Sequence, residues 1–387
     1  MKNARLYSLA VLLVFLTISP AVRQTSDVLS SAAIDKIEAV ITREMERGKV
    51  PAISIAIATN NKLVYAKGFG KADLENSVPA KETTVYRTAS IAKAMTSTAV
   101  MQLAEKGKLD LDAPIQKYCS AFPKKQWPVT ARQLLGHLGG VRHYKTGEEA
   151  TGTAAYYTIV DSMALFKDEP LLHEPGTKFN YTTFGYSVLG CAIEGASGMS
   201  YEDYMRQHVF QSAGMSQTGI DHSRLVIPNR ARGYMLLDEE TYKRLPDAAK
   251  RFAKVGEVYN CSLHDTSMKV PGGGLVSTAV DLVNFALAVN TRVLVSEKSR
   301  EQMWTRQKMK DGKETAYGLG WGVDQISGQK VVSHGGGQAG TSTYLGLVPE
   351  RGVAIGVMSN LERFAVDRLV REIGNLLLSS PQQSSNR

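Results

Sequence analysis

The chain has 387 residues, 43% of them hydrophobic and 21% charged, and its formal charge at pH 7 is +9. This composition is that of a globular protein, long enough for one large two-lobed unit or for two or three average domains. The positive charge favours anionic surfaces, but basic residues form no extended block, which argues against nucleic-acid binding.

The first residues have the pattern of an export signal. Lys2 and Arg5 form a positive start, residues 6–18 form an apolar run, and 19–21 make a small-x-small cleavage site. We therefore expect residues 1–21 to be a signal peptide, which places the mature protein in the periplasm or outside the cell. An uncleaved N-terminal anchor is the alternative, although the apolar run is shorter than the about 20 residues of a membrane span.

Strands are expected near both ends of the chain. Apolar residues at helical spacing predict a first helix that starts near Ile34 and ends at Gly48. Alternating residues 51–57 and the run 63–69 then predict two strands joined by a turn. Near the other end, three further strands and a last helix are expected at 330–334, 343–348, 353–358 and 366–376.

Helices and loops fill the middle of the chain. Thr130 and Gln133 form a capping box that begins a helix, which we expect to close at Gly139. The stretch 271–274 is expected to be a loop, followed by a helix capped near Ser277 or Thr278. Other helices are expected at 96–105, 184–195 and 201–210.

These elements predict an α+β fold: one antiparallel sheet from both termini, flanked by the terminal helices, with a mostly helical insert between. A cleft is expected where the insert meets the sheet. The expected boundaries are 28–380 for the whole domain, 28–85 and 325–380 for the sheet lobe, 86–324 for the helical lobe, and 381–387 for a polar tail.

Ser90 and Lys93 form a Ser-x-x-Lys pattern at the start of a helix that Gly107 ends. Residues i and i+3 share one helix face, so Lys93 Nζ is expected beside Ser90 Oγ. A serine hydroxyl becomes a good nucleophile when a base takes its proton. A lysine acts as that base when burial lowers its pKa, and apolar residues surround Lys93 in the sequence.

Two other segments are candidate parts of the same site. Tyr181 opens a helix after a Pro-Gly turn, and His334 is followed by three glycines at the expected end of a strand. A second Ser-x-x-Lys pattern, at 327–330, leads into a strand-like run and so lacks the helix that the geometry needs.

The cysteines and histidines predict neither a disulfide framework nor a metal site. Cys119, Cys191 and Cys261 are odd in number and widely spaced, and Cys191 is typical of a core position; a single bridge remains open. There is no His-Glu-x-x-His, and Cys261 with His264 makes half a metal site. We expect no metal and no other cofactor.

The chain contains three motifs in order: Ser-x-x-Lys on a helix, a tyrosine motif about ninety residues later, and His-x-Gly at a strand end. This series resembles that of the serine β-lactamase and penicillin-binding-protein superfamily. The similarity is closest to its class C-like branch, and within that to the mitochondrial serine β-lactamase-like proteins and their bacterial relatives. The resemblance spans about residues 30 to 375 and implies a β-lactamase/transpeptidase-like fold. Its stretches are 87–93, 107–112, 134–140, 142–144, 181–186, 229–232, 271–281 and 349–352.

The resemblance implies roles for individual residues. Ser90 matches the nucleophile, Lys93 its base partner, and Tyr181 the tyrosine that assists proton transfer to the leaving group. The backbone N–H groups of Ser90 and Gly337 match an oxyanion hole. Substrate-binding positions are Thr183, His334, Gly335 and Gly336. The implied activity is that of a secreted or periplasmic serine hydrolase acting through an acyl-enzyme on an ester, a peptide-like amide or a β-lactam.

The chain departs from the superfamily pattern at two positions. Thr183 stands where Tyr-x-Asn enzymes have the asparagine that contacts the acyl side chain. His334 stands where penicillin-binding enzymes keep a lysine, and an unperturbed histidine titrates near pH 6.5. We therefore expect the charge of His334 to tune substrate choice; the alternative is that His334 only donates a hydrogen bond on the Tyr181 side of the cleft.

Other assignments explain fewer of these features. A Ser/His/Asp triad built on Ser90 and His334 lacks a Gly-x-Ser-x-Gly elbow and an aspartate partner. A catalytically weak or inactive family member, acting as a penicillin-binding, scaffold or filament-forming protein, is the second hypothesis. The expected partner is a small-molecule or peptide substrate, and the sequence leaves the oligomeric state open.

Overall fold

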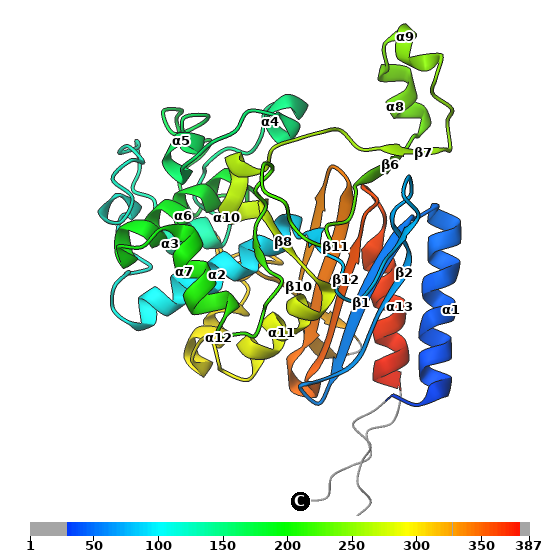
Figure 1. The fold of residues 1–387 in the computed structure, drawn as a ribbon. Coiled ribbons are helices and arrows are strands. Elements are labelled where there is room, and N and C mark those ends of the chain that lie inside the picture. Colours follow the sequence, from blue (N-terminus) through cyan, green and yellow to red (C-terminus); the bar gives the residue numbers. More distant parts are fainter. Residues whose placement is uncertain (1–28, 327, 380–387) are drawn as a thin grey trace, which may run out of the picture. The chain divides into compact units, whose positions relative to one another are not determined.

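A computed structural model describes residues 29–326 and 328–379. The expected signal peptide, the polar tail and Ser327 lie outside the described residues. The described chain forms a seven-stranded antiparallel sheet in the order β3-β2-β1-β12-β11-β10-β9, so strands from both ends of the chain share one sheet (Figure 1). The strands are β1 (Ala52–Thr59), β2 (Lys62–Asp73), β3 (Val78–Pro79), β9 (Gly322–Ile326), β10 (Gln329–Gln338), β11 (Thr341–Val348) and β12 (Val353–Ser359).

The expected α+β fold is thereby confirmed. Its centre is the pair β1 and β12, in which Ile53 lies opposite Ser359 and Ile57 opposite Ile355. β1 is buried on both faces, because its alternating residues belong to two cores. The isoleucines at 53, 55 and 57 pack in the core under the terminal helices, and Ala56 and Ala58 pack in the larger core on the other side.

Helices cover both faces of the sheet. On one face α1 (Ser31–Gly48) and α13 (Val366–Ser379) lie side by side, as the blue and red helices of Figure 1 show. On the other face α11 (Ala279–Asn290) contacts β1, β2, β11 and β12. Gly356 of β12 permits this close approach, because a Cβ there would lie 2.9 Å from the carbonyl oxygen of Ala279.

The helical part is organised around α2 (Ala92–Glu105), in which every residue from Ala92 to Leu103 is buried. It packs against α6 (Phe184–Ser197) and α10 (Val270–Gly273), and a 3₁₀ turn before it (Ala89–Ile91) contacts β10 and β11. The helical part therefore meets the sheet at the residues around Ser90. The remaining helices are α3 (Ala131–Leu135), α4 (Gly147–Thr151), α5 (Ile159–Met163), α7 (Tyr201–Met205), α8 (Glu239–Arg244), α9 (Asp247–Lys250) and α12 (Glu297–Met303).

Several elements differ from the sequence-based expectation. The capping box at Thr130 is present, but α3 ends at Leu135 because His137 adopts a left-handed conformation with φ of 58°. The expected loop 271–274 instead contains the single helical turn α10. β10 does not end at His334 but continues through the glycines to Gln338.

The middle of the chain also contains short strands that were not expected from the sequence. β4 (Tyr86–Arg87), β8 (Leu275–Ser277) and β5 (Gly219–Ile220) form a small sheet directly before the Ser90 turn. β6 (Tyr234–Leu236) and β7 (Val258–Asn260) form a hairpin whose connection carries α8 and α9 (Figure 1).

One disulfide crosslinks the helical part. It joins Cys119 to Cys191 of α6, and Cys261 is free. Cys191 is buried, as its apolar surroundings predict, but it serves as a bridge as well as a core residue. A native disulfide that closes a loop of this length typically stabilises a fold by about 2–4 kcal/mol.

Within residues 29–326 and 328–379, no helix has both the length and the apolar character that crossing a bilayer requires.

Candidate active site

Ser90 lies on a tight turn that the small sheet fixes in place. The pairing of β4 with β8 carries the chain to Thr88, whose backbone N–H donates to Leu275 O at 2.9 Å. Ala89 then adopts a φ of 46°, which is uncommon for a residue with a side chain and marks a locally strained backbone. Ser90 follows at the start of the helix, where the first N–H groups have no partner inside the helix.

Lys93 is fully buried on the first turn of α2 and its Nζ makes three polar contacts. It lies 3.0 Å from Ser90 Oγ, 3.2 Å from Thr183 Oγ1 and 2.7 Å from Gly272 O. The i, i+3 arrangement expected from the sequence therefore brings Lys93 and Ser90 into hydrogen-bond distance. Among the described residues, no carboxylate pairs with Lys93.

Burial lowers the pKa of Lys93 well below its usual value, and the positive charge of Lys269 lowers it further. A neutral amine has two N–H donors and one lone pair. The Gly272 carbonyl can only accept, so it takes one of the N–H groups. The lone pair is then available to accept the proton of the Ser90 hydroxyl, which is the arrangement of a general base beside a nucleophile.

Tyr181 completes this group. Its ring centre lies 4.8 Å from Lys93 Nζ. Burial raises the pKa of Tyr181 to about 12, and a hydrogen bond with the Ser90 side chain partly opposes this rise. Tyr181 is therefore protonated at neutral pH and is placed to give a proton rather than to take one. The structure brings all three expected catalytic residues together.

Aromatic residues from distant parts of the chain enclose Lys93 and Tyr181. The His137 ring centre lies 4.2 Å from that of Tyr181 and 4.8 Å from that of Tyr317. The Tyr186 ring centre lies 5.6 Å from Lys93 Nζ, and the Tyr186 hydroxyl donates to Leu135 O at 2.9 Å. These rings exclude water from the lysine and so maintain the desolvation that lowers its pKa.

His334 does not carry the conditional charge expected from the sequence. Its Nδ1 lies 2.7 Å from Gly335 O and its Nε2 lies 2.7 Å from the Tyr317 hydroxyl. Since a carbonyl oxygen only accepts, Nδ1 carries the proton and Nε2 accepts from Tyr317. Burial, with a smaller effect of Lys93, lowers the pKa of His334 to about 3. His334 is thus neutral throughout the pH range in which it was expected to titrate, and its bond to Tyr317 replaces the bond expected on the Tyr181 side.

The three glycines after His334 have different surroundings. A Cβ on Gly336 would lie 2.4 Å from Thr88 O, whereas no atom lies within 4 Å of the corresponding position on Gly337. Gly336 is therefore the residue that lets β10 approach the Ser90 turn. Gly335 and Gly337 are exposed, and Gly337 lies opposite Ser342 of β11.

Thr183 links Lys93 to His143 through two hydrogen bonds. Thr183 is 4% exposed and its Oγ1 contacts Lys93, so it positions the lysine instead of facing an acyl side chain as expected. Its backbone N–H donates to His143 Nδ1 at 3.2 Å, which leaves the proton of neutral His143 on Nε2. Burial is the largest cause that lowers the pKa of His143 to about 4, followed by the charges of Lys93 and Lys269.

A sequence model of the Beta-lactamase family matches residues 37–378. The chain belongs to the beta-lactamase family. This membership confirms the superfamily indicated by the motifs and identifies the chain as a serine hydrolase.

Two curated relatives illustrate the match. The chain is 29% identical to the human "Serine beta-lactamase-like protein LACTB, mitochondrial", over 88% of this chain and 79% of that protein. It is 31% identical to "Penicillin-binding protein 4*" of Bacillus subtilis (strain 168), over 76% of this chain and 64% of that protein.

Solved structures agree with the fold. The octameric penicillin-binding protein homologue from Pyrococcus abyssi superposes with a TM-score of 0.74 at 28% identity, covering 89% of this chain and 77% of that one. The D-amino acid amidase from Ochrobactrum anthropi SV3 superposes with a TM-score of 0.75 at 24% identity, covering 90% of this chain and 99% of that one. The likeness to the amidase shows the shared β-lactamase/transpeptidase-like fold.

Five residues around Ser90 were not found from the sequence. His137, His143 and Tyr186 lie in the stretches 134–140, 142–144 and 181–186 that carry the resemblance, and Lys269 lies two residues before the stretch 271–281, but these motifs assign them no role. Each of the five acts through a contact made only in the folded chain. The five are His137, His143, Tyr186, Lys269 and Tyr317.

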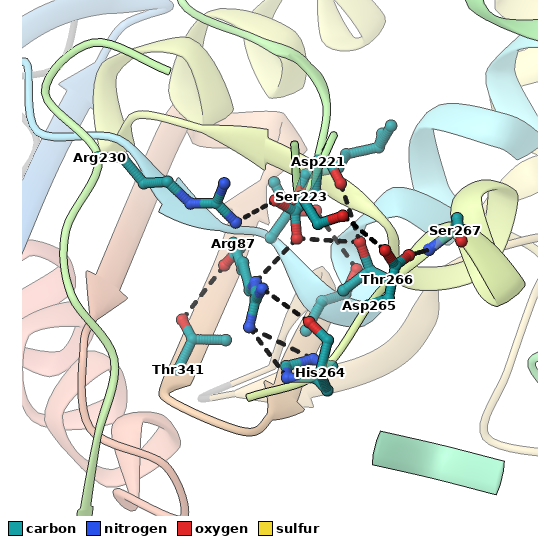
Figure 2. A network of polar contacts seen from close by, with 12 residues as sticks. Arg87, Asp221, Ser223, Arg230, His264, Asp265, Thr266, Ser267 and Thr341 are labelled. Carbon is teal, nitrogen blue, oxygen red and sulfur yellow. Dashed lines mark hydrogen bonds and ion pairs between the residues drawn. The ribbon is translucent and has the colours of Figure 1, made fainter. Parts of the chain in front are cut away.

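A buried polar network holds the strand that precedes Ser90 (Figure 2). The Asp221 carboxylate accepts from Arg87 Nε at 2.8 Å and pairs with Arg230 from another side. Arg87 also contacts His264 Nδ1 at 3.0 Å, and Thr266 Oγ1 donates to Asp221 at 2.9 Å. The network thus ties residues 221–230 and 264–266 to β4, three residues before the nucleophile position.

A cavity of about 550 Å³ lies beside this network. It is lined by Arg87, by parts of 230–233 and 260–265, by Gly340 of the β10–β11 turn and by Thr341 at the start of β11. Ser90, Lys93 and Tyr181 do not line it, so it adjoins the candidate site without containing the reactive groups.

Substituting Gly336 tests how closely β10 must approach the Ser90 turn. Gly336→Ala places a methyl group 2.4 Å from a backbone oxygen and from Thr343 Oγ1, so β10 or the turn must shift. We expect a loss of about 1–3 kcal/mol in the free energy of unfolding and of about 100-fold in hydrolysis of an ester substrate. Urea denaturation and initial rates measure both. Gly337→Ala is the matched control for stability, because its methyl group enters open space; equal midpoints for the two variants would contradict the close contact.

Proposed function

We propose that this family member is an exported serine acyl hydrolase that works through an acyl-enzyme on Ser90. The observation that carries the proposal is the contact of 3.0 Å between Ser90 Oγ and a buried Lys93 that no carboxylate of the described chain neutralises. Lys93 is in the state that a general base needs, and Tyr181 is in the state that a general acid needs.

In the proposed acylation, Ser90 Oγ forms a bond to the carbonyl carbon of the substrate while its proton passes to Lys93 Nζ. The electron pair of the carbonyl moves to its oxygen, which the backbone N–H groups of Ser90 and Gly337 stabilise as the oxyanion hole. The tetrahedral intermediate collapses, the bond to the leaving group breaks, and the leaving group receives a proton through Tyr181. Tyr181 recovers that proton from Lys93, so the lysine is neutral again.

In the proposed deacylation, water attacks the acyl carbon and its proton passes to the same pair of groups. The acid product leaves and the hydroxyl of Ser90 is restored. His334 supports this chemistry indirectly, because its bond to Tyr317 fixes the ring that packs against His137 and Tyr181. Gly335 and Gly336 form the edge of β10 along which substrate would lie, and Thr183 keeps Lys93 pointed at Ser90.

The acyl donors open to this site are esters, peptide-like amides and β-lactams, since all three present a carbonyl with a leaving group to the same nucleophile. A β-lactam is a sensible probe because a relative 31% identical to this chain is named a penicillin-binding protein. The similarity of the Ser90, Tyr181 and His334 motifs to the class C-like branch supports the same assignment.

We also propose that the protein is exported. The signal pattern of residues 1–21 supports this, and so does the Cys119–Cys191 disulfide, since such bonds persist mainly in oxidising compartments. N-terminal sequencing of protein recovered from the periplasm or medium should begin near Val22. An intact Met1 terminus in the soluble cytoplasm would contradict export.

Labelling with a fluorophosphonate tests the nucleophile. We expect one adduct on the peptide that contains Ser90, none in Ser90→Ala, and a fall in ester hydrolysis of about a thousandfold or more in that variant. Ser327→Ala is the matched control, because Ser327 begins the second Ser-x-x-Lys pattern. Peptide mass spectrometry and p-nitrophenyl ester rates give both readings. An unlabelled wild-type protein would refute the proposal and favour the non-catalytic scaffold or filament hypothesis.

Replacing Lys93 tests the base. Lys93→Ala and Lys93→Arg should each slow acylation by about 100-fold or more, the usual range for a general base. Arginine keeps a positive charge but cannot accept a proton near neutrality, so it should not rescue the rate. Lys330→Arg, in the second Ser-x-x-Lys pattern, is the control. Stopped-flow burst kinetics measure the acylation step; near-normal acylation in Lys93→Arg would mean that the proton goes elsewhere.

A further inference from the structure

Lys269 is a second buried lysine beside the Ser90 turn. It is 4% exposed and ends a 3₁₀ turn, Ser267–Lys269, directly before α10, whose Gly272 carbonyl accepts from Lys93. A Cβ on Gly273 would lie 3.8 Å from Lys269 Cδ and also 3.8 Å from the carbonyl group of Ala89. Gly273 therefore lies between the stem of Lys269 and the residue that precedes the nucleophile position.

The ammonium group of Lys269 is only partly satisfied. Its Nζ donates to Ala150 O at 2.9 Å and lies 5.7 Å from the Tyr144 ring centre. An ammonium has three N–H donors, and within the described part of the chain no other hydrogen-bond acceptor and no carboxylate is paired with this one. A buried charge without an anionic partner costs free energy that a bound anion would offset.

The charges around Lys269 leave it as the cation of the site near neutral pH. Burial is the largest cause that lowers its pKa to about 8; Arg87 lowers it further and Asp221 opposes both. Lys93, from α2, has a pKa well below its usual value. His143 is neutral, and Tyr144 is held protonated by burial. At pH 7 Lys269 is therefore mostly charged, whereas Lys93, His143 and Tyr144 are neutral.

We propose that Lys269 binds a carboxylate of the acyl donor, and that the substrates of this site are acyl donors that carry a carboxylate group. The inference rests on the proposed function, because it assigns the substrate class of the same site. It places the recognition cation beside Tyr144 and Ala150, whereas His334 on β10 is neutral.

A purely structural role makes a different prediction. The bond to Ala150 could serve only to hold α4 in place. In that case loss of the lysine would slow every substrate alike, whereas a carboxylate-binding role affects only substrates that carry the anion.

The test compares kcat/KM for two matched ester pairs. The first pair is p-nitrophenyl hexanoate and the p-nitrophenyl monoester of adipic acid, in which a carboxylate replaces the terminal methyl group of the acyl chain. The second is phenyl hexanoate and 3-carboxyphenyl hexanoate, which moves the carboxylate to the leaving group. In wild-type protein we expect one pair to show a preference for the charged member at pH 7.

Lys269→Met should reduce that preference by about 10- to 100-fold, the range for a hydrogen bond to a charged group, while the neutral ester keeps its rate within a few-fold. Lys269→Arg should retain the preference. Lys145→Met is the control, because Lys145 directly follows Tyr144 in the sequence and is an exposed lysine that already pairs with Glu169. Circular dichroism melting shows whether each variant is folded.

The pH dependence gives a reading that needs no variant. Lys269 is protonated below its pKa of about 8, so the wild-type ratio of charged to neutral ester should be highest below pH 8 and fall as the pH rises through it. In Lys269→Arg the ratio should stay level from pH 7 to 10. Protonation of Lys93 at low pH slows both esters equally and cancels in the ratio.

The outcomes separate this inference from the proposed function. Suppose that a fluorophosphonate labels the wild-type protein at Ser90, but that the ratio of kcat/KM for the charged and neutral esters does not change with pH in either pair. This result would overturn the role of Lys269 and leave the proposed hydrolase activity intact. A Lys269→Met variant that slows both members of each pair equally overturns it as well. Absence of labelling in wild type refutes the hydrolase itself.

Discussion

The site depends on the exclusion of water from the side chain of Lys93. Lys93 is buried among α2, α6, α10 and a group of aromatic rings, and the polar groups of the described chain that contact its Nζ are a carbonyl and two hydroxyls. None of these groups carries a negative charge, so nothing compensates a protonated amine, and desolvation favours the neutral form. The free energy for this unfavourable placement comes from the surrounding core, in which every residue of α2 up to Leu103 is buried.

The histidines around the site extend the same principle. His143 and His334 each have one ring nitrogen fixed by a backbone group, which determines the tautomer without a carboxylate. His137 is fully buried, and its Nδ1 accepts from the Thr182 N–H. Burial lowers the pKa of all three, and the nearby lysines add to the effect. Near neutral pH Lys269 is therefore the cation of the site, and Lys93 and the imidazoles act as neutral hydrogen-bonding groups.

Local patterns in the sequence predicted what depends on local geometry. Ser90 and Lys93 lie one helical turn apart, so their contact follows once the helix forms. The sheet from both termini followed from alternating residues near the two ends of the chain. The pKa of His334 was mispredicted, because a sequence motif does not show that Tyr317 and the core bury the ring. Lys269 was missed and the Cys119–Cys191 bridge was left open for a related reason, since each depends on segments brought together only by folding.

The central pairing of the sheet has a consequence for the order in which the chain can fold. The Ala52 backbone N–H of β1 bonds the side chain of Asn360, 308 positions later, just beyond β12. β1 can pair with β2 soon after both are made, but its other edge pairs with β12 and one of its faces is covered by α11, so nearly the whole chain must leave the ribosome before β1 is enclosed. Contacts of such long sequence separation form slowly. The sheet therefore stays incomplete through most of the synthesis of the chain, and a polypeptide without its completed fold is in the state in which it can be threaded through a membrane pore.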